Sequence, residues 1–531
     1  MEPREKGITK AASVVGLFTL LSRILGFVRD AVIAAIFGAG LYADAFFVAF
    51  RIPNLLRRLV GEGALTVSFI PVFTEELARK GQGRAKELAS TAFTLFTIVL
   101  LVLTFLGIAF APWIVGFISP GFADTPMKLS LTISLTRWMF PFLFFISLVA
   151  LAMGVLNSLK HFTAPALAPA LFNISIVLCA VILLPYLDEP VYVLAVGVVI
   201  GGIAQLLFQL PFLHRYGMLP RPTLEFTDPA IKRVIALMIP SVFGVAVYQI
   251  GIFITTRFAS NLAEGSVSYL YYADRVMEFP LGIFGIAIAT VVLPSMSEDV
   301  ANEDWQGFKE SISFATRLII FITLPATVGL IALGIPIINI LFQRGEFTQE
   351  ATRGTAYALY FYSLGLISFS GTRVFASAFY SMKDTFTPVM VAGIALVTNV
   401  ILALLLMGPL KHGGLALATT LASQLNFILL FLILRRRIGR VGGMAIISSA
   451  FKIAIASLFM GIWVYLISLL GEWSTDGVTL EKVIVLTGAI ISGAGLFFFV
   501  TQILKSPELS FLQGLIKERF ETHHENRGNS Q

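Results

Sequence analysis

The sequence predicts an all-α polytopic membrane protein of about fourteen transmembrane helices, arranged as two parallel six-helix lobes with two further helices at the C-terminal end. Of its 531 residues, 57% are hydrophobic and only 13% are charged, whereas soluble domains carry about 25% charged residues. Apolar windows of about 20 residues, long enough to cross a bilayer, recur along the whole chain. A weak internal repeat indicates that the first and second halves share one architecture.

The first window follows Arg4, Lys6 and Lys10 like a signal peptide, but it contains Arg23 and Arg29, so we expect a retained first helix. The windows are centred near Leu21, Phe50, Leu100, Phe142, Ile174, Ile200, Phe243, Ile283, Ile322, Phe361, Ile394, Ala422, Phe459 and Ile490. Basic residues cluster after the second, sixth and twelfth windows, at 79–86, 215–233 and 435–440. Positive charge favours the cytoplasmic side, so both termini are predicted to be cytoplasmic.

The repeat has an offset of 223 residues, as between Ser158 and Ser381. The matching residues are Ser158, Lys160 and Pro165 with Ser381, Lys383 and Pro388, and Pro71, Thr74 and Glu75 with Pro294, Ser297 and Glu298. Matched segments are six windows apart, and an even number preserves direction, so the lobes are predicted to be parallel repeats. The predicted lobes are residues 1–225 and 226–440; residues 441–505 hold the two added helices, and residues 506–531 form a cytoplasmic amphipathic tail.

Arginines inside the apolar windows are the main functional signal. They are Arg23, Arg29, Arg51, Arg57, Arg58 and Arg275. An arginine at the bilayer centre costs at least about 2.5 to 3.5 kcal/mol, and such residues usually face a bundle interior or a watery cavity. The planar guanidinium fork suits phosphate or pyrophosphate better than a cation. The sequence therefore predicts a cavity for an anion; structural ion pairs or snorkelling from helix ends are the alternative.

The second window places several charged residues on one helical face, at 100° per residue. They are Asp44, Arg51, Arg58 and Glu62. Pro53 and the glycines of residues 61–63 should kink or loosen this helix, and broken helices at membrane depth mainly line cavities or are buried in protein. Arg57 lies on another face unless the kink turns it inward.

Two further windows carry charge. Arg23 and Asp30 share a face of the first helix, and Gly26 between them permits close approach of a partner, whereas Arg29 lies about 240° away. In the eighth window Arg275 is grouped with acidic residues. Either Asp274 or Glu278 is expected to hold it.

Four short motifs stand out in these windows: residues 22–30 (SRILGFVRD), 44–50 (DAFFVAF), 53–58 (PNLLRR) and 272–280 (YADRVMEFP). In this order they resemble the MurJ-type (MviN) lipid II flippases of the multidrug/oligosaccharidyl-lipid/polysaccharide exporter superfamily. The resemblance spans most of the first 410 residues. It implies two six-helix lobes and two added helices that form a groove for the lipid tail.

The resemblance implies a transporter, not an enzyme, in the bacterial cytoplasmic (inner) membrane. It would move lipid II, an undecaprenyl-pyrophosphate glycolipid, from the inner to the outer leaflet by alternating access through a central arginine-lined cavity. The family's essential positions correspond here to Arg23, Arg29, Arg57 and Arg275, with Asp30 and Asp44 as acidic companions. Membrane lipids and cell-wall synthesis proteins are the expected partners, and nucleic acid is not.

No GxxxxGK[ST] motif occurs, so direct use of ATP is not expected, and no cofactor is predicted. The membrane potential or a coupling cation, sodium or a proton, would supply the energy. Asp384, Thr398 and Asn399 are the candidate sodium ligands, although the seventh window lacks an acidic residue to complete such a site.

Other functions stay open. A flippase for another polyprenyl-pyrophosphate oligosaccharide would use the same arginines, and a cation-coupled drug or small-solute antiporter would need acidic cavity residues, which arginine outnumbers here. A membrane enzyme would need carboxylate pairs or histidines at the surface, whereas the five histidines are scattered without metal-ligand spacing.

Overall fold

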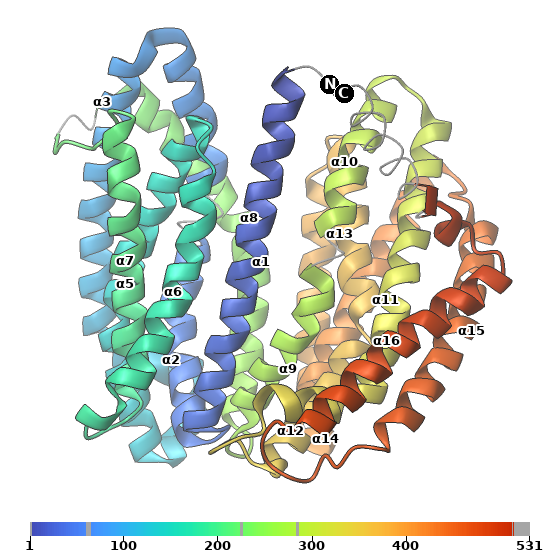
Figure 1. Ribbon diagram of the computed structural model, residues 1–531. Coiled ribbons are helices and arrows are strands. Elements are labelled where there is room, and N and C mark those ends of the chain that lie inside the picture. The colour runs from blue at the N-terminus through green and yellow to red at the C-terminus, as the bar shows by residue number, and fades with distance from the viewer. Residues whose placement is uncertain (1–2, 60–64, 224–226, 283–285, 512, 515–531) are drawn as a thin grey trace, which may run out of the picture. The chain divides into compact units, whose positions relative to one another are not determined.

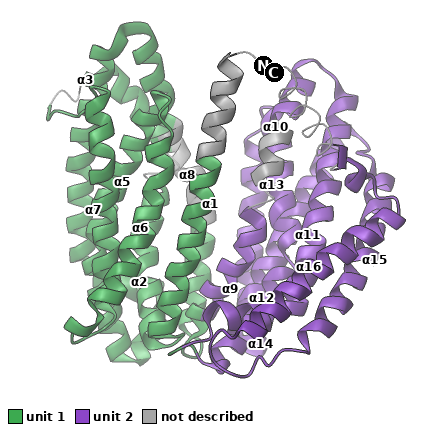
Figure 2. Cartoon of the chain, in the orientation of Figure 1, with its two compact units in different colours: residues 1–268, 345–347 green, residues 269–344, 348–531 purple. Residues whose placement is uncertain are grey.

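The computed structural model describes residues 3–59, 65–223, 227–282, 286–511 and 513–514. Every regular element in these ranges is helical, and none of them contains a strand, which confirms the predicted all-α class. The chain divides into two compact units (Figure 2): residues 1–268 with 345–347, and residues 269–344 with 348–531.

Unit 1 is built from α-helices that run alongside one another and two short 3₁₀ turns (Figure 1). Its elements are α1 (Pro3–Phe37), α2 (Leu41–Arg57), α3 (Thr66–Ala109), α4 (Ala111–Ile118), η2 (Pro120–Asp124), α5 (Pro126–Ser158), α6 (Thr163–Ile182), η3 (Leu184–Tyr186), α7 (Tyr192–Arg215) and α8 (Pro229–Ser260). Helix α5 packs against α2, α3 and α7, and α6 packs against α1 and α7.

Unit 2 begins within the first turn of α9 and contains the remaining helices. They are α9 (Ser266–Pro280), α10 (Ile286–Ala301), α11 (Trp305–Phe342), α12 (Gln349–Ser363), α13 (Leu366–Ser381), α14 (Phe386–Ile438), α15 (Gly443–Ser468) and α16 (Leu480–Ile503). Helix α11 is central, because α10, α12, α13, α15 and α16 all pack against it.

Eight of the described helices are long and apolar enough to cross a membrane. Two of these are long enough for two crossings: the 44 residues of α3 and 53 of α14 would extend about 66 and 80 Å, against a hydrocarbon core of about 30 Å. Each contains a break, at Gly81 (φ 80°) and Lys411 (φ 50°). The ends of α14 meet, since Arg437 in its last turn lies 2.6 Å from the Asp384 carboxylate. The number fourteen stays a prediction.

The 223-residue repeat is visible in the backbone as a recurring interruption. A π-helical turn follows α2 at residues 58–59, and another follows α9 at residues 281–282. The two positions differ by the predicted offset. Short π-helical turns are rare and occur often at functional sites. The loosening predicted for the second window has a counterpart at the same offset in the other half of the chain.

The turns that follow α5 and α13 are a second match. Lys160 and Lys383 both have φ 61°, a left-handed conformation that is uncommon outside glycine. Their backbone amides donate to equivalent carbonyls, at 2.9 Å to Asn157 and 2.9 Å to Tyr380. The predicted offset therefore recurs at two places in the backbone, and the duplication of whole lobes stays a prediction.

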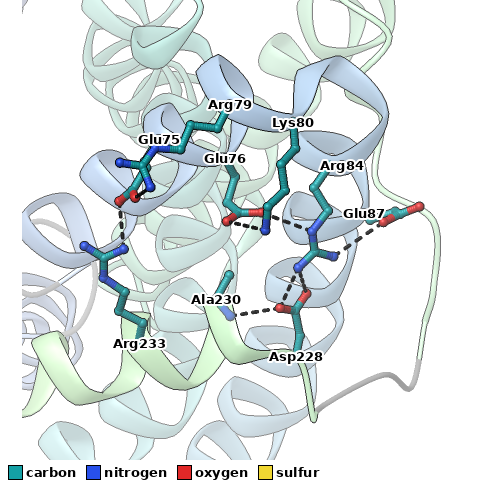
Figure 3. Close-up of polar contacts among 9 residues, drawn as sticks. All are labelled: Glu75, Glu76, Arg79, Lys80, Arg84, Glu87, Asp228, Ala230 and Arg233. Atoms are coloured by element: carbon teal, nitrogen blue, oxygen red, sulfur yellow. Dashed lines mark hydrogen bonds and ion pairs between the residues drawn. The ribbon is translucent and has the colours of Figure 1, made fainter.

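Helix α8 packs within unit 1, against α3, α4 and η2. Charged side chains hold its first turns (Figure 3): Arg84 lies 2.6 Å from Asp228, and Arg233 lies 2.7 Å from Glu75. At its other end, Arg257 donates to the Phe117 carbonyl. The lobe boundary predicted from the repeat lies at residue 225, before α8. The boundary between the two compact units lies at residue 268, after α8.

Replacing Asp228 by asparagine should loosen the start of α8. Asp228 caps this helix by accepting from the Ala230 amide at 2.9 Å. Burial alone would raise the pKa of its carboxyl, but hydrogen bonds from Arg84 and Ala230 outweigh burial and lower it. Asparagine can still cap the helix, but it loses the negative charge that pairs with Arg84. We therefore expect a loss of about 1 to 2 kcal/mol of local stability, measured as faster amide hydrogen exchange in the first turn of α8.

Acid should have the same effect on the unchanged protein. The folded-state pKa of Asp228 is below its ordinary value, so this stabilisation is complete above the ordinary pKa and is lost as the pH falls through the lowered one. Asp124, an exposed acid in the same unit, is the matched control for the asparagine substitution. Unchanged exchange in the Asp228 variant would show that the pair does not hold α8.

The two added helices pack against unit 2. Phe321 of α11, Ile453 of α15 and Phe497 of α16 share one buried cluster, which also contains Leu509. Glu508 is buried and lies 3.2 Å from Arg317. The chain after α16 therefore returns onto α11 at residues 506–511, and the apolar residues predicted for one face of the tail, at 512, 515, 516 and 520, lie outside the described residues.

Candidate functional site

Arg29 lies in the last third of α1 and is the buried one of the predicted arginines in the part of the chain that the structure describes. The residue is 7% exposed, and its guanidinium bonds to the fully buried Asp30, with Nε and Nη2 lying 3.0 and 2.6 Å from Oδ1. Nη1 donates to Oδ1 of Asn173 on α6, at 3.1 Å. The Phe172 ring lies 6.0 Å from the guanidinium carbon. This cationic group is therefore fixed from two helices.

The predicted face of α1 also contains Arg23 and Gly26. Arg23 is half-buried, and Gly26 is buried on the same helix. Arg29 and Asp30 were expected on different faces, yet their side chains meet, because residues 100° apart on a helix can be joined by a long arginine. Asp30 thus holds Arg29 directly.

Asp44 on α2 is surrounded by donors from unit 1. Its carboxylate accepts from Lys128 at 2.7 Å, from the Gly265 amide at 2.8 Å, and from the Ser268 amide and hydroxyl at 2.9 and 2.6 Å. The side chain is almost fully buried. These donors include the first turn of α9, so Asp44 caps a helix, where negative charge is favourable.

The basic residues of α2 have separate partners. Arg51 donates to the Thr256 hydroxyl of α8, and Arg57 Nε donates to Asn54 Oδ1 at 2.8 Å. Both are half-buried, as is Arg58 in the π turn that follows the helix. The kink-forming Pro53 is buried within α2. Glu62 and its flanking glycines lie outside the described residues.

Arg275 is the counterpart of these residues in unit 2. Its Nη1 lies 3.1 Å from Glu278 Oε2, so of the two predicted holders Glu278 makes a direct ion pair. Asp274 is half-buried on the same helix. Arg275 precedes its π turn by six residues, and Arg51 precedes the equivalent turn by seven. The two broken helices therefore carry arginine at nearly the same level.

The candidate sodium ligands are not gathered at one place. Asp384 accepts from the Thr387 hydroxyl at 2.6 Å, and the bonds from Thr387 together with the charge of Arg437 lower the pKa of its carboxyl. Thr398 and Asn399 lie about 18 Å farther along α14, at 1.5 Å per residue from Phe386. Thr398 donates instead to the Ile394 carbonyl at 2.9 Å. Within the described ranges, no group of three or more His, Cys, Asp or Glu side chains could hold a metal ion.

Sequence analysis missed several partners of the predicted charges, among them Lys128, Asn173 and Thr256. Lys128 opens an apolar helix and lies 4.3 Å above the Phe122 ring. Asn173 and Thr256 are buried polar residues in α6 and α8. In the sequence they are marked only as polar residues inside apolar windows. In many helices such a residue bonds to a backbone carbonyl of its own helix, so the signal does not identify a partner.

Comparison with known proteins identifies the family. The family model described as "Lipid II flippase MurJ" matches residues 33–484. "Probable lipid II flippase MurJ" of Vibrio cholerae is 41% identical over 436 residues, covering 80% of this chain and 82% of that protein. "Lipid II flippase MurJ" of Burkholderia cenocepacia is 40% identical over 434 residues, covering 81% and 84%.

Solved structures agree with this assignment. A lipid II flippase MurJ in an inward closed conformation has a TM-score of 0.77 at 27% identity, covering 94% of this chain and 99% of that one. An inward-facing multidrug transporter of the MATE family, at 16% identity, has a TM-score of 0.66 and covers 81% of this chain and 98% of its own; this second likeness concerns the fold alone. The chain therefore belongs to the MurJ family of lipid II flippases.

Proposed function

We propose that this protein moves lipid II from the inner to the outer leaflet of the bacterial cytoplasmic membrane by alternating access, with both termini in the cytoplasm. The observation that carries the proposal is Arg29, a buried guanidinium inside an apolar helix that is held by both Asp30 and Asn173. Such an arrangement keeps a permanent cation in place at membrane depth. It suits a pyrophosphate headgroup, which matches the guanidinium fork.

The polyprenyl tail would stay in lipid while the headgroup crosses in a polar environment. Transfer of an unshielded pyrophosphate through hydrocarbon costs on the order of tens of kcal/mol, so binding to preorganised cations removes most of the barrier. Arg29 and Arg275 are each proposed to bind the headgroup in the course of transport. The ion pairs with Asp30 and Glu278 would hold these cations between transport events.

The energy would come from the membrane potential or from a coupling cation. A potential of 100 mV supplies about 2.3 kcal/mol for each charge that crosses, enough to bias the direction of transport. Because Asp384 is already bound by Thr387 and Arg437, a cation site would have to use other ligands than the three predicted together.

A rescue experiment tests this function. A bacterium depleted of its own lipid II flippase would express this protein or its Arg275→Ala variant, and lipid II in the outer leaflet would be measured. We expect rescue by the unchanged protein and at least a tenfold loss for Arg275→Ala at equal membrane insertion, because a charge-assisted bond to the headgroup is lost.

The matched control is Arg79→Ala, because the Arg79 side chain is 75% exposed in the α3 turn and should leave rescue unchanged. If a well-inserted unchanged protein fails to rescue, while a lipid-linked oligosaccharide of another kind is transported, the substrate assignment is wrong. If Arg275→Ala rescues fully, Arg275 does not bind the headgroup.

A further inference from the structure

We propose that Asn173 is a positioning residue for lipid II transport, holding the Arg29 guanidinium in place with a neutral hydrogen-bond acceptor. Asn173 lies on α6, 144 residues along the chain from Arg29. Its role depends on the headgroup binding of Arg29 proposed above, and the two are tested separately below.

The Asn173 amide bonds to α1 at two levels. Its Oδ1 accepts from Arg29 Nη1 at 3.1 Å, and its Nδ2 donates to the Ser22 carbonyl at 3.0 Å. Ser22 and Arg29 are seven residues apart, which places them two turns apart on the same side of the helix. Because each end of the amide has its own partner, the side chain cannot rotate without losing both bonds.

Burial makes these bonds matter. Asn173 is 6% exposed and Arg29 is 7% exposed, so water does not readily replace a lost partner. Hydrogen bonds are stronger in such surroundings, and a buried polar group that loses its partner is costly. The amide therefore joins α6 to α1 and fixes the direction of the guanidinium, together with Asp30 on the other side.

The neutrality of Asn173 is the specific point. Arg29 and Asp30 carry formal charges of +1 and −1, which sum to zero, and Asn173 leaves that sum unchanged. A carboxylate at position 173 could accept from Nη1 equally well, but it would bring the three side chains to a net −1 and repel a pyrophosphate. An asparagine orients the arginine without opposing the anion that it is to bind.

The charge argument predicts a specific order of substrate affinity for two variants of Asn173. Asn173→Asp keeps the size and the acceptor for Arg29 but replaces the group that donates to the Ser22 carbonyl by an oxygen that cannot donate. A merely structural role therefore predicts a loss of stability in both variants and equal substrate affinity in the protein that inserts. The charge argument predicts instead a larger loss of substrate affinity in Asn173→Asp than in Asn173→Ala. We expect the half-saturating amount of lipid II to rise about tenfold in Asn173→Asp and about threefold in Asn173→Ala.

The test uses full-length protein in proteoliposomes that contain a series of lipid II fractions, with the half-saturating fraction and the maximal rate measured for each variant. Gln205→Glu is the matched control, because it also changes a buried amide to an acid on a neighbouring helix, where Gln205 bonds to the Gly201 carbonyl at 3.2 Å. Its half-saturating fraction should stay within twofold of the unchanged protein.

The outcomes separate the two proposals. Absence of transport by the unchanged protein would overturn the proposed function itself, and full transport by Arg29→Ala would overturn the headgroup binding of Arg29 on which this inference rests. With those controls in order, an unchanged half-saturating fraction in both Asn173 variants, or a larger rise in alanine than in aspartate, would overturn the role of Asn173. If Asn173→Asp does not insert, Asn173→Ala decides alone: a half-saturating fraction equal to that of the unchanged protein contradicts the inference.

Discussion

Replacing Arg29 by alanine should abolish lipid II translocation while leaving the protein inserted in the membrane. Arg29 is the buried arginine that Asp30 and Asn173 hold from two helices. Charge-assisted hydrogen bonds contribute about 1.5 to 3 kcal/mol each, so the loss of two to a headgroup would slow transport by roughly a hundredfold or more. The measurement is lipid II flipping in proteoliposomes at equal protein content.

Arg29→Lys separates charge from shape. Lysine keeps the cation but lacks the planar fork, so it cannot bond to Asp30 through two nitrogens and to Asn173 through a third. We expect an intermediate rate, at least about tenfold below that of the unchanged protein. Full activity of Arg29→Lys would show that a point charge suffices, and full activity of Arg29→Ala would show that this residue does not bind the headgroup.

Replacing Asp44 by alanine should cause the largest loss of stability. The change removes four hydrogen bonds from Lys128, Gly265 and Ser268 and leaves the Lys128 ammonium, with its side chain 8% exposed, without this carboxylate. Breaking a buried ion pair from one side costs about 3 to 5 kcal/mol. The measurement is the unfolding temperature of the purified protein in detergent.

A second substitution shows whether the stranded charge is the cause. The double variant Asp44→Ala with Lys128→Met should be more stable than Asp44→Ala alone, because methionine removes the unpaired ammonium. Asp124→Ala, at an exposed acid of the same unit, should unfold with the unchanged protein. If Asp44→Ala keeps its unfolding temperature but loses lipid II binding, Asp44 contacts the headgroup rather than capping α9.

The sequence did not predict which partners several of the charged residues have. Helical geometry grouped Asp44 with the α2 arginines, because it considers only one helix. In the folded unit, donors from α5 and from the start of α9 reach Asp44 first. The same limit explains the candidate sodium site. Asp384 and Asn399 are close in sequence, but the rise along α14 separates them. The Asp384 carboxylate instead forms an ion pair with Arg437, near the C-terminal end of α14.

The sequence by itself determined the helical class of the protein and the charged residues of its apolar segments, and it predicted the repeat, because hydrophobic length, repeat offset and residue type can be read along the chain. The π turns at residues 58–59 and 281–282 lie at the offset of 223 residues that the sequence predicted. Only the tertiary structure decided which partner each charge receives. Asn173 lies 144 residues from Arg29, and no periodicity within α1 or α6 can identify a hydrogen bond that depends on how two helices pack.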